Sequence, residues 1–235
     1  MSIFAISDLH LSFGVEKPMN VFGKIWDNYE DKIKENWIKK VKENDTVIIP
    51  GDISWGMTLN ETKKDFSFIN SLPGKKLIMK GNHDYYFSTK TKLDKFFKEN
   101  NFDTLNVLYN NAYDVEDYII CGTRGWGKID GNSADLTRKI IRREEIRLKI
   151  SLEEAKKIQE YYNNKNITKK IIVAMHFPPF TGKFEEILNE YNVYKCIYGH
   201  LHGYGHSMIK EGKIKDVIYI MVSCDYTNFD LIRLD

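Results

Sequence analysis

The chain has 235 residues, 42% of them hydrophobic, and its formal net charge at pH 7 is +2. A chain of this length and composition can bury one sizeable core, so we expect a single domain over residues 1–235. The small net charge argues against binding to nucleic acid through a basic face. Three widely spaced cysteines outside any CxxC pattern, and the lack of a run of about 18 apolar residues, favour a reduced cytoplasmic protein without a membrane span.

Eight short apolar runs rich in β-branched residues predict β-strands. Unbroken runs of this length are typical of strands that are covered on both faces. In chain order the runs are residues 3–6, 46–49, 77–79, 118–121, 171–175, 196–198, 217–222 and 231–234.

Three helices are predicted in the intervals between the first four of these strands. The first covers residues 29–41, where apolar side chains recur at helical spacing in a Lys/Glu-rich stretch. Thr58 and Glu61 have the spacing of a capping box for the second helix, and Ser88 is the expected N-cap of the third. The apolar residues expected on these helices are Tyr29, Ile33, Trp37, Ile38, Val41, Phe66, Ile69, Leu93, Phe96 and Phe97.

Residues 133–163 form the most charged stretch of the chain, and we predict a helical insertion there. Ser151 and Glu154 offer a second capping box, so we expect two helices with a break near Ile150. We interpret the basic side chains of this stretch as a solvated face, with a lid that brings positive charge over an anionic substrate as the alternative. These side chains are Arg138, Lys139, Arg142, Arg143 and Arg147.

Five of the predicted strands are followed by short clusters of carboxylate, amide or imidazole groups. Residues two apart on an extended chain point to the same side, so Asp8 and His10 can reach one ion. The glycines that open three of the clusters let the backbone turn sharply at a strand end. One such cluster means little, but five in this order form a joint signal. The clusters are Asp8-Leu9-His10, Gly51-Asp52, Gly81-Asn82-His83-Asp84, Met175-His176 and Gly199-His200-Leu201-His202.

The clusters offer a mixed set of nitrogen and oxygen ligands without thiolate. Such a set suits two divalent ions in five or six coordination, Mn²⁺ first, with Fe or Zn²⁺ as alternatives. Two such ions carry more positive charge than Asp8, Asp52 and a bridging hydroxide neutralise. The remaining charge attracts phosphate, and the ions lower the pKa of the bridging water, so the pattern predicts a metal-dependent phosphoester hydrolase.

The ordered set of clusters resembles the calcineurin-like metallophosphoesterase superfamily, whose pattern is DxH, GDxx, GNH(D/E), H and GHxH. All five blocks match between residues 8 and 202. The resemblance, which is to a bacterial-type phosphohydrolase, implies an α/β fold. That fold is a four-layered αββα sandwich of two mixed β-sheets flanked by helices.

The resemblance also implies a role for each residue of the clusters. His83 would stabilise the phosphoryl transition state or protonate the leaving oxygen, and Asn82 would contact the substrate as well as a metal. The implied ligands are Asp8, His10, Asp52 and His202 for the first metal, with Asp52 bridging, and Asn82, His176 and His200 for the second.

Trp55 is a departure from the family pattern. Three residues after the bridging aspartate, Ser/Thr protein phosphatases carry a second Asp, the nucleases of the superfamily a His and purple acid phosphatases a Tyr. An indole only donates hydrogen bonds and is no metal ligand. Gly56 stands where the protein phosphatases have Arg. Without these groups, the residue that orients His83 is open: Asp84 is one candidate, and the alternative is that Asp84 braces its loop.

The sequence indicates a reaction class more clearly than a substrate. Arg124, in a glycine-rich segment after a predicted strand, is either a bidentate ligand of the substrate phosphate or half of a structural ion pair. We expect small phosphomonoesters or phosphodiesters, nucleotides included, as substrates. The alternatives are a nuclease, a protein phosphatase or a non-catalytic scaffold. The small net charge argues against a nuclease, and the Trp55-Gly56 pair argues against a protein phosphatase. The complete ligand set argues against a non-catalytic scaffold.

Overall fold

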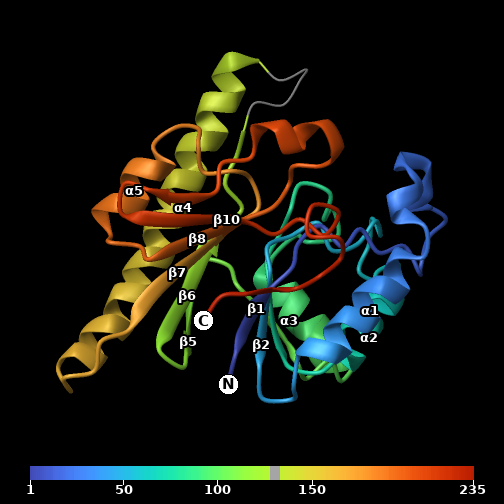
Figure 1. The fold of residues 1–235 in the computed structure, drawn as a ribbon, viewed down its shortest axis with the longest axis horizontal. Helices are drawn as coiled ribbons and strands as arrows, with labels where there is room; N and C mark the ends of the chain where they lie inside the picture. Colours follow the sequence, from blue (N-terminus) through green and yellow to red (C-terminus); the bar gives the residue numbers. More distant parts are fainter. Residues whose placement is uncertain (128–132) are drawn as a thin grey trace.

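The computed structural model describes residues 1–127 and 133–235, and its layers are visible in Figure 1. Two β-sheets face each other, with helices on the outer face of each. The expected four-layered α/β sandwich is therefore confirmed.

Within the described residues the first sheet has five strands. In spatial order they are β11 (Ile232–Arg233), β1 (Ile3–Ala5), β2 (Thr46–Ile49), β3 (Lys75–Ile78) and β4 (Leu105–Val107). Strands β1 to β4 are parallel, and β11 pairs antiparallel with β1. The sheet is therefore mixed, and the carboxyl ends of β1, β2 and β3 meet along one edge.

The second sheet has six strands in the same part of the chain. Their spatial order is β5 (Ala112–Val115), β6 (Tyr118–Thr123), β7 (Lys170–Met175), β8 (Lys195–Tyr198), β10 (Val217–Met221) and β9 (Gly212–Ile214). The four central strands are parallel, and both edge strands are antiparallel to their neighbours.

The helices divide between the two sheets. Helices α1 (Tyr29–Lys40), α2 (Lys63–Ser71) and α3 (Lys90–Glu99) bury their apolar side chains against the first sheet. Helices α4 (Ala134–Asn163) and α5 (Phe184–Glu190) pack on the second sheet. Short 3-10 turns at Met19–Phe22, Lys24–Trp26 and Gly203–Met208 complete the regular structure that the model describes.

A third apolar cluster joins the two sheets. It contains Ile3, Ala5 and Ile48 from the first sheet and Ile172 and Ala174 from the second, all almost fully buried. Because the strands are covered on both faces, their sequences are unbroken apolar runs rather than alternating ones. All eight predicted strands exist, and their ends differ from the prediction by at most two residues. Strands β4, β5 and β9 were not predicted, because they are short and only partly buried or exposed at sheet edges.

The predicted break near Ile150 is wrong, since α4 is one continuous helix of 30 residues. Ser151 lies inside it, fully buried, and does not cap a helix. Its Oγ accepts a hydrogen bond from the Gly122 amide (2.9 Å) and donates one to the Asn111 carbonyl (2.7 Å). Tertiary partners therefore satisfy a hydroxyl that would otherwise compete with the helix backbone.

Two predicted helix starts also differ from the structure. Thr58 and Glu61 form the hydrogen bonds of a capping box, but these close a turn before α2, which begins at Lys63. The N-cap of α3 is Thr89, whose side chain accepts from the Lys92 amide, rather than Ser88.

Candidate metal centre

The polar clusters meet because parallel strands end at a common edge. Asp8, Asp52 and Asn82 follow β1, β2 and β3 of the first sheet, and His176 and His200 follow β7 and β8 of the second. Ligand sites of α/β proteins form in the crevice at such carboxyl ends. The structure brings together all of the ligands that the sequence predicted.

Several of these residues have a strained backbone. Asp8, His10, Asp52 and His200 have φ angles of 61°, 47°, 51° and 73°, in the left-handed region that non-glycine residues rarely adopt. Such strain is typical of functional sites, where the surrounding structure holds a residue in one orientation. Here the strain occurs at four residues whose side chains point into one site.

The cluster glycines have two different structural reasons. Gly51 has a φ angle of 98°, so the expected sharp turn is confirmed there. Gly81 and Gly199 instead stand where a side chain has no room. A Cβ atom at Gly81 would lie 2.0 Å from Asp52 Oδ1, and one at Gly199 would lie 2.3 Å from Asp8 Oδ2. These two glycines let the carboxylates approach the backbone.

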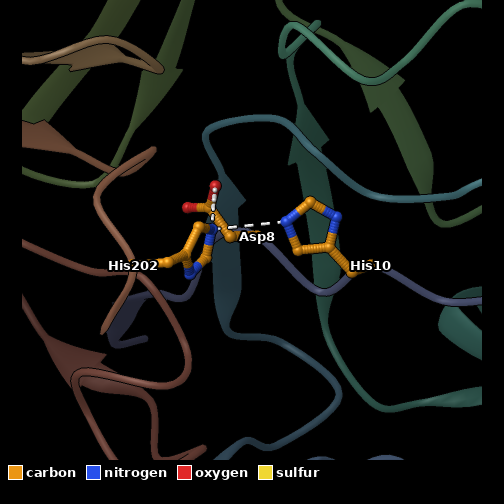
Figure 2. Close-up of side chains that lie close together, drawn as sticks. All are labelled: Asp8, His10 and His202. Carbon is orange, nitrogen blue, oxygen red and sulfur yellow. Dashed lines mark hydrogen bonds and ion pairs between the residues drawn. The ribbon is translucent and has the colours of Figure 1, made fainter. Parts of the chain in front are cut away.

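One group of possible metal ligands consists of Asp8, His10 and His202 (Figure 2), whose donor atoms lie within 4.8 Å of one another. His202 Nε2 is 3.3 Å from Asp8 Oδ1 and 3.3 Å from His10 Nε2. The residues come from opposite ends of the chain and from both sheets.

A second group contains Asp52, His176 and His200, again with donor atoms within 4.8 Å. The amide oxygen of Asn82 lies 2.7 Å from His176 Nε2. His176 Nδ1 faces the Pro50 carbonyl at 3.0 Å, which favours the tautomer with the proton on Nδ1. The lone pair of Nε2 then faces the oxygen of Asn82, and a cation between these donors would relieve their repulsion.

Asp52 lies between the two groups. Its Oδ2 is 3.9 Å from His10 Nε2 and 3.4 Å from His176 Nε2, whereas its Oδ1 accepts a hydrogen bond from the His83 amide (2.8 Å). One carboxylate oxygen therefore faces both groups of donors.

Burial keeps most of the imidazoles neutral. It lowers the pKa of His176 to about 3 and that of His200 to about 4, and with the charge of His202 it lowers the pKa of His10 well below its usual value. A neutral imidazole has the free lone pair that a metal ion needs.

The buried carboxylates of the site lie close to one another and to His202, so a positive charge is stabilised there. Burial raises the pKa of Asp52, and the nearby charges of Asp84 and Asp8 raise it further. Burial opposes a proton on His202, but hydrogen bonds to Asp225 and Asp8 raise its pKa to about 10. The carboxylates that stabilise this proton are equally able to stabilise a bound cation.

Two supporting residues of the site were not predicted from the sequence, although they fit the same pattern. Asp225 accepts from His202 Nδ1 (2.8 Å), and the Ser223 hydroxyl donates to Asp8 Oδ2 (2.8 Å). Both follow β10, so they are a sixth polar cluster after a predicted strand. Hydrogen bonds of this kind orient metal ligands and fix their tautomers.

The carboxylate of Asp84 is occupied by the loops that follow β2 and β3. Its buried carboxylate accepts hydrogen bonds from the backbone amides of Asp52, Ile53, Ser54 and Gly81 and from the Tyr86 hydroxyl. This geometry favours the bracing role over an orienting contact with His83.

His83 is surrounded by aromatic rings. Its ring centroid lies 4.7 Å from that of Trp55 and 5.6 Å from that of His10, and Trp55 stacks on His10 at 4.8 Å. The Trp55 indole Nε1 points to Met19 Sδ at 3.1 Å. The position that departs from the family pattern therefore packs against a predicted metal ligand and the predicted acid.

A pocket of about 460 Å³ opens beside the first group of ligands. His10, His83 and His202 form its polar side, and Phe22, Ile25, Trp26 and Tyr204 are among its apolar lining residues. The site can therefore accept a ligand with a polar group at the histidines and an apolar part beside it.

Arg124 lies away from the ligand side chains. Its guanidinium is 3.6 Å from Glu144 Oε1 and stacks over the Trp126 ring at 4.6 Å. Only its backbone carbonyl contacts the site, by accepting hydrogen bonds from the amides of His176 and Phe177. Of the two roles that the sequence left open for Arg124, the ion pair is therefore present in the structure.

The fold and the converging donors define an α/β sandwich protein with a candidate site for divalent metal ions. The sequence model of the family described as calcineurin-like phosphoesterase matches residues 1–204. The chain belongs to this family and is a hydrolase that acts on phosphoester bonds. Two His/Asp groups that suit divalent metal ions lie within the described residues.

Solved structures share the fold at low sequence identity. A protein of unknown function, AQ665 from Aquifex aeolicus, is 18% identical with a TM-score of 0.52, over 99% of this chain and 95% of that one. The protein TT1561 of Thermus thermophilus is 11% identical with a TM-score of 0.55, over 99% and 97%. No curated protein matches the sequence. None of the described helices is long and apolar enough to cross a membrane.

Proposed function

We propose that the protein is a two-metal phosphoesterase that hydrolyses small phosphomonoesters or phosphodiesters, nucleotides among them. The observation that supports this most is the position of Asp52 Oδ2, which lies between His10 and His176 and faces both groups of donors. A bridging carboxylate is the feature that a dinuclear site needs and that two separate metal sites would lack.

The proposed ligands are those that the sequence indicated. The mixed nitrogen and oxygen donors suit Mn²⁺ first and Fe or Zn²⁺ as alternatives. When bound, such ions neutralise phosphate charge and lower the pKa of a coordinated water molecule, so that a nucleophile exists near neutral pH. The set is Asp8, His10, Asp52 and His202 for one ion, and Asp52, Asn82, His176 and His200 for the other.

The chain's own residues would orient the ester and supply a proton. His83 borders the apolar pocket, so we propose that its ring protonates the leaving oxygen while the organic group occupies that pocket. Asn82 contacts the phosphate, and Trp55 positions His83 by packing on its ring. Asp84 braces the loops that follow β2 and β3 of the first sheet and touches no substrate.

The alternatives from the same superfamily fit less well. The net charge of +2 and the apolar wall of the pocket suit a small ester better than a nucleic acid or a phosphoprotein surface. A scaffold without catalysis predicts gaps among the ligands, and the described residues contain the full predicted set. The three buried free thiols, Cys121, Cys196 and Cys224, support a reduced cytoplasmic location.

The test combines metal content with a small panel of esters. We expect about two metal ions per chain after loading with Mn²⁺, and hydrolysis of p-nitrophenyl phosphate, bis(p-nitrophenyl) phosphate or cyclic nucleotides. One metal ion per chain would contradict the dinuclear site. Two metal ions with no activity on any small ester, but activity on DNA or a phosphoprotein, would support an alternative instead.

A further inference from the structure

A second cavity, of about 230 Å³, lies beside the metal centre. It is bounded by the residues that follow β3, β4 and β6 and by the N-terminal half of α4. Four cationic side chains line it, against a single carboxylate. They are Lys80, Arg124, Arg143 and Arg147, and the carboxylate is Glu144.

Glu144 positions the guanidinium groups without neutralising them. Its fully buried Oε1 lies 2.7 Å from Arg147, 3.4 Å from Arg143 and 3.6 Å from Arg124, while its Oε2 accepts from the Thr123 hydroxyl. Within residues 1–127 and 133–235, no other carboxylate pairs with these three arginines. One negative charge is therefore shared among three positive ones, and Lys80 adds a fourth.

Arg124 has unused hydrogen-bonding capacity at this place. Its side chain is only 16% exposed, and its buried Nε has no hydrogen-bond partner among the described residues. A buried charged donor without a partner is costly, and a ligand that accepts hydrogen bonds would remove this cost.

We propose that this cavity binds an oxyanion of the phosphate class, beside the metal centre and distinct from it. Arginine forks bind the oxygens of phosphate in pairs, and convergence of three guanidinium groups and one ammonium matches a tetrahedral anion. The anion is either free phosphate or a second phosphate group of the substrate. In the second case the inference rests on the proposed function and narrows its substrate class.

The cavity also has a short route to the metal ligands. Lys80 lies two residues before Asn82, and the backbone carbonyl of Arg124 accepts from the His176 amide. An anion in the cavity would therefore contact the segment that leads to Asn82, and through Arg124 it would lie one residue from the backbone hydrogen bond to His176. Arg143 and Arg147 of the predicted solvated face and the predicted phosphate-binding Arg124 line one cavity, whereas the neighbouring Arg142 does not line it.

Phosphate-binding stoichiometry of the metal-loaded protein tests the inference. Titration calorimetry with inorganic phosphate should find two sites in the wild type, one at the metals and one in the cavity. In Arg147→Gln the cavity site should weaken about 10- to 100-fold, the scale of a lost charged hydrogen bond. Arg143→Gln should weaken it less, and Arg142→Gln is the matched control that should leave both sites unchanged.

The outcomes separate this inference from the proposed function. A single site that survives Arg147→Gln would overturn the cavity and leave the metal site intact. A single site that is lost in Arg147→Gln but kept in Asp52→Asn would support the cavity and contradict the metal site. Arg147→Lys, which keeps the charge without the planar fork, covers the case in which Arg147→Gln does not fold, and unchanged cavity binding in that variant would also overturn the inference.

Kinetics then identify the source of the anion. If the cavity takes part of the substrate, the ratio of kcat/KM for a sugar bisphosphate to that for its monophosphate should fall about tenfold or more in Arg147→Gln. If it takes free phosphate, added phosphate should change kcat for p-nitrophenyl phosphate in the wild type, and this response should be lost in the variant.

Discussion

The two sheets contribute different chemistry to the metal centre. Loops of the first sheet carry both carboxylates and the amide, whereas loops of the second sheet carry only imidazoles. Each group of donors combines a carboxylate from the first sheet with at least one imidazole from the second. Neither sheet holds a complete site, so metal ions bound here would hold the two sheets together.

The two halves of the molecule, each built on one sheet, also brace their ligands differently. The loops of the first sheet are held by the Asp84 carboxylate through backbone amides, which fixes the backbone around Asp52. On the second sheet the supporting contacts are to the rings themselves, from Asp225 to His202 and from the Pro50 carbonyl to His176. Asp52 on the first sheet is therefore held through its backbone, whereas His176 and His202 on the second sheet are held through the tautomers of their rings.

Asp52→Asn should have the largest effect, because one oxygen faces donors of both halves. We expect both metal ions and all detectable phosphoesterase activity to be lost. Elemental analysis of the purified variant checks this. Two metal ions per chain in Asp52→Asn would show that the two groups of donors bind their ions independently.

His83→Ala should slow turnover by about 10²- to 10⁴-fold, the usual contribution of a general acid. Metal content should stay at the wild-type level, because the ring of His83 belongs to neither group of donors. Steady-state kinetics and elemental analysis on the same preparation check both parts. Loss of metal would make His83 a ligand of the first half.

Removing the metal ions should lower the free energy of unfolding. With free metal at about 1,000 times its Kd, binding to the folded state alone contributes about 4 kcal/mol per site. The apoprotein should remain folded, because the apolar cluster between the sheets does not depend on metal. Denaturant unfolding with and without a chelator checks this, and equal stabilities would show that the ions do not join the halves.

Trp55→Ala should lower kcat by about tenfold, the scale of a lost aromatic contact, with little change in KM. Trp55→Phe should restore most of the rate, because a phenyl ring can still pack on His83. A loss that is identical in both variants would mean that the indole acts through its contact with Met19 and not through His83.

Asp65→Asn should have the smallest effect of these variants. It should change how the free energy of unfolding depends on pH. Burial raises the pKa of Asp65 to about 6, against hydrogen bonds from Ser54 and the Phe13 amide that lower it. The wild type therefore has its full stability below the unfolded pKa, near 3.8, and loses part of it as pH rises through about 6.

The variant lacks this titration, so its stability relative to wild type should improve between pH 4 and pH 7, measured by urea unfolding at each pH. An unchanged difference would contradict the assignment. Asp65 of the first half has no cationic partner among the described residues, unlike Glu144 of the second half.

Most of the candidate metal centre could be predicted because each proposed ligand lies within a few residues of the end of a strand. Each strand is an unbroken apolar run, and the ligands follow it directly, as at Asp8 and Asp52. The roles of Asp225 and Arg124 could not be predicted, because they depend on which distant segments meet. The same limit explains the helix break wrongly predicted near Ser151, whose hydroxyl is satisfied by residues from 29 and 40 positions away.

The pairing of β11 with β1 has a consequence for how the protein is made. Strand β1 lies inside the first sheet and is followed by Asp8, but Ser223, Asp225 and β11 are synthesised at least 215 residues after Asp8. Residues 1–204 include every proposed ligand, yet a nascent chain of that length lacks the groups that orient Asp8 and His202. Metal uptake should therefore follow the synthesis of Ser223 and Asp225.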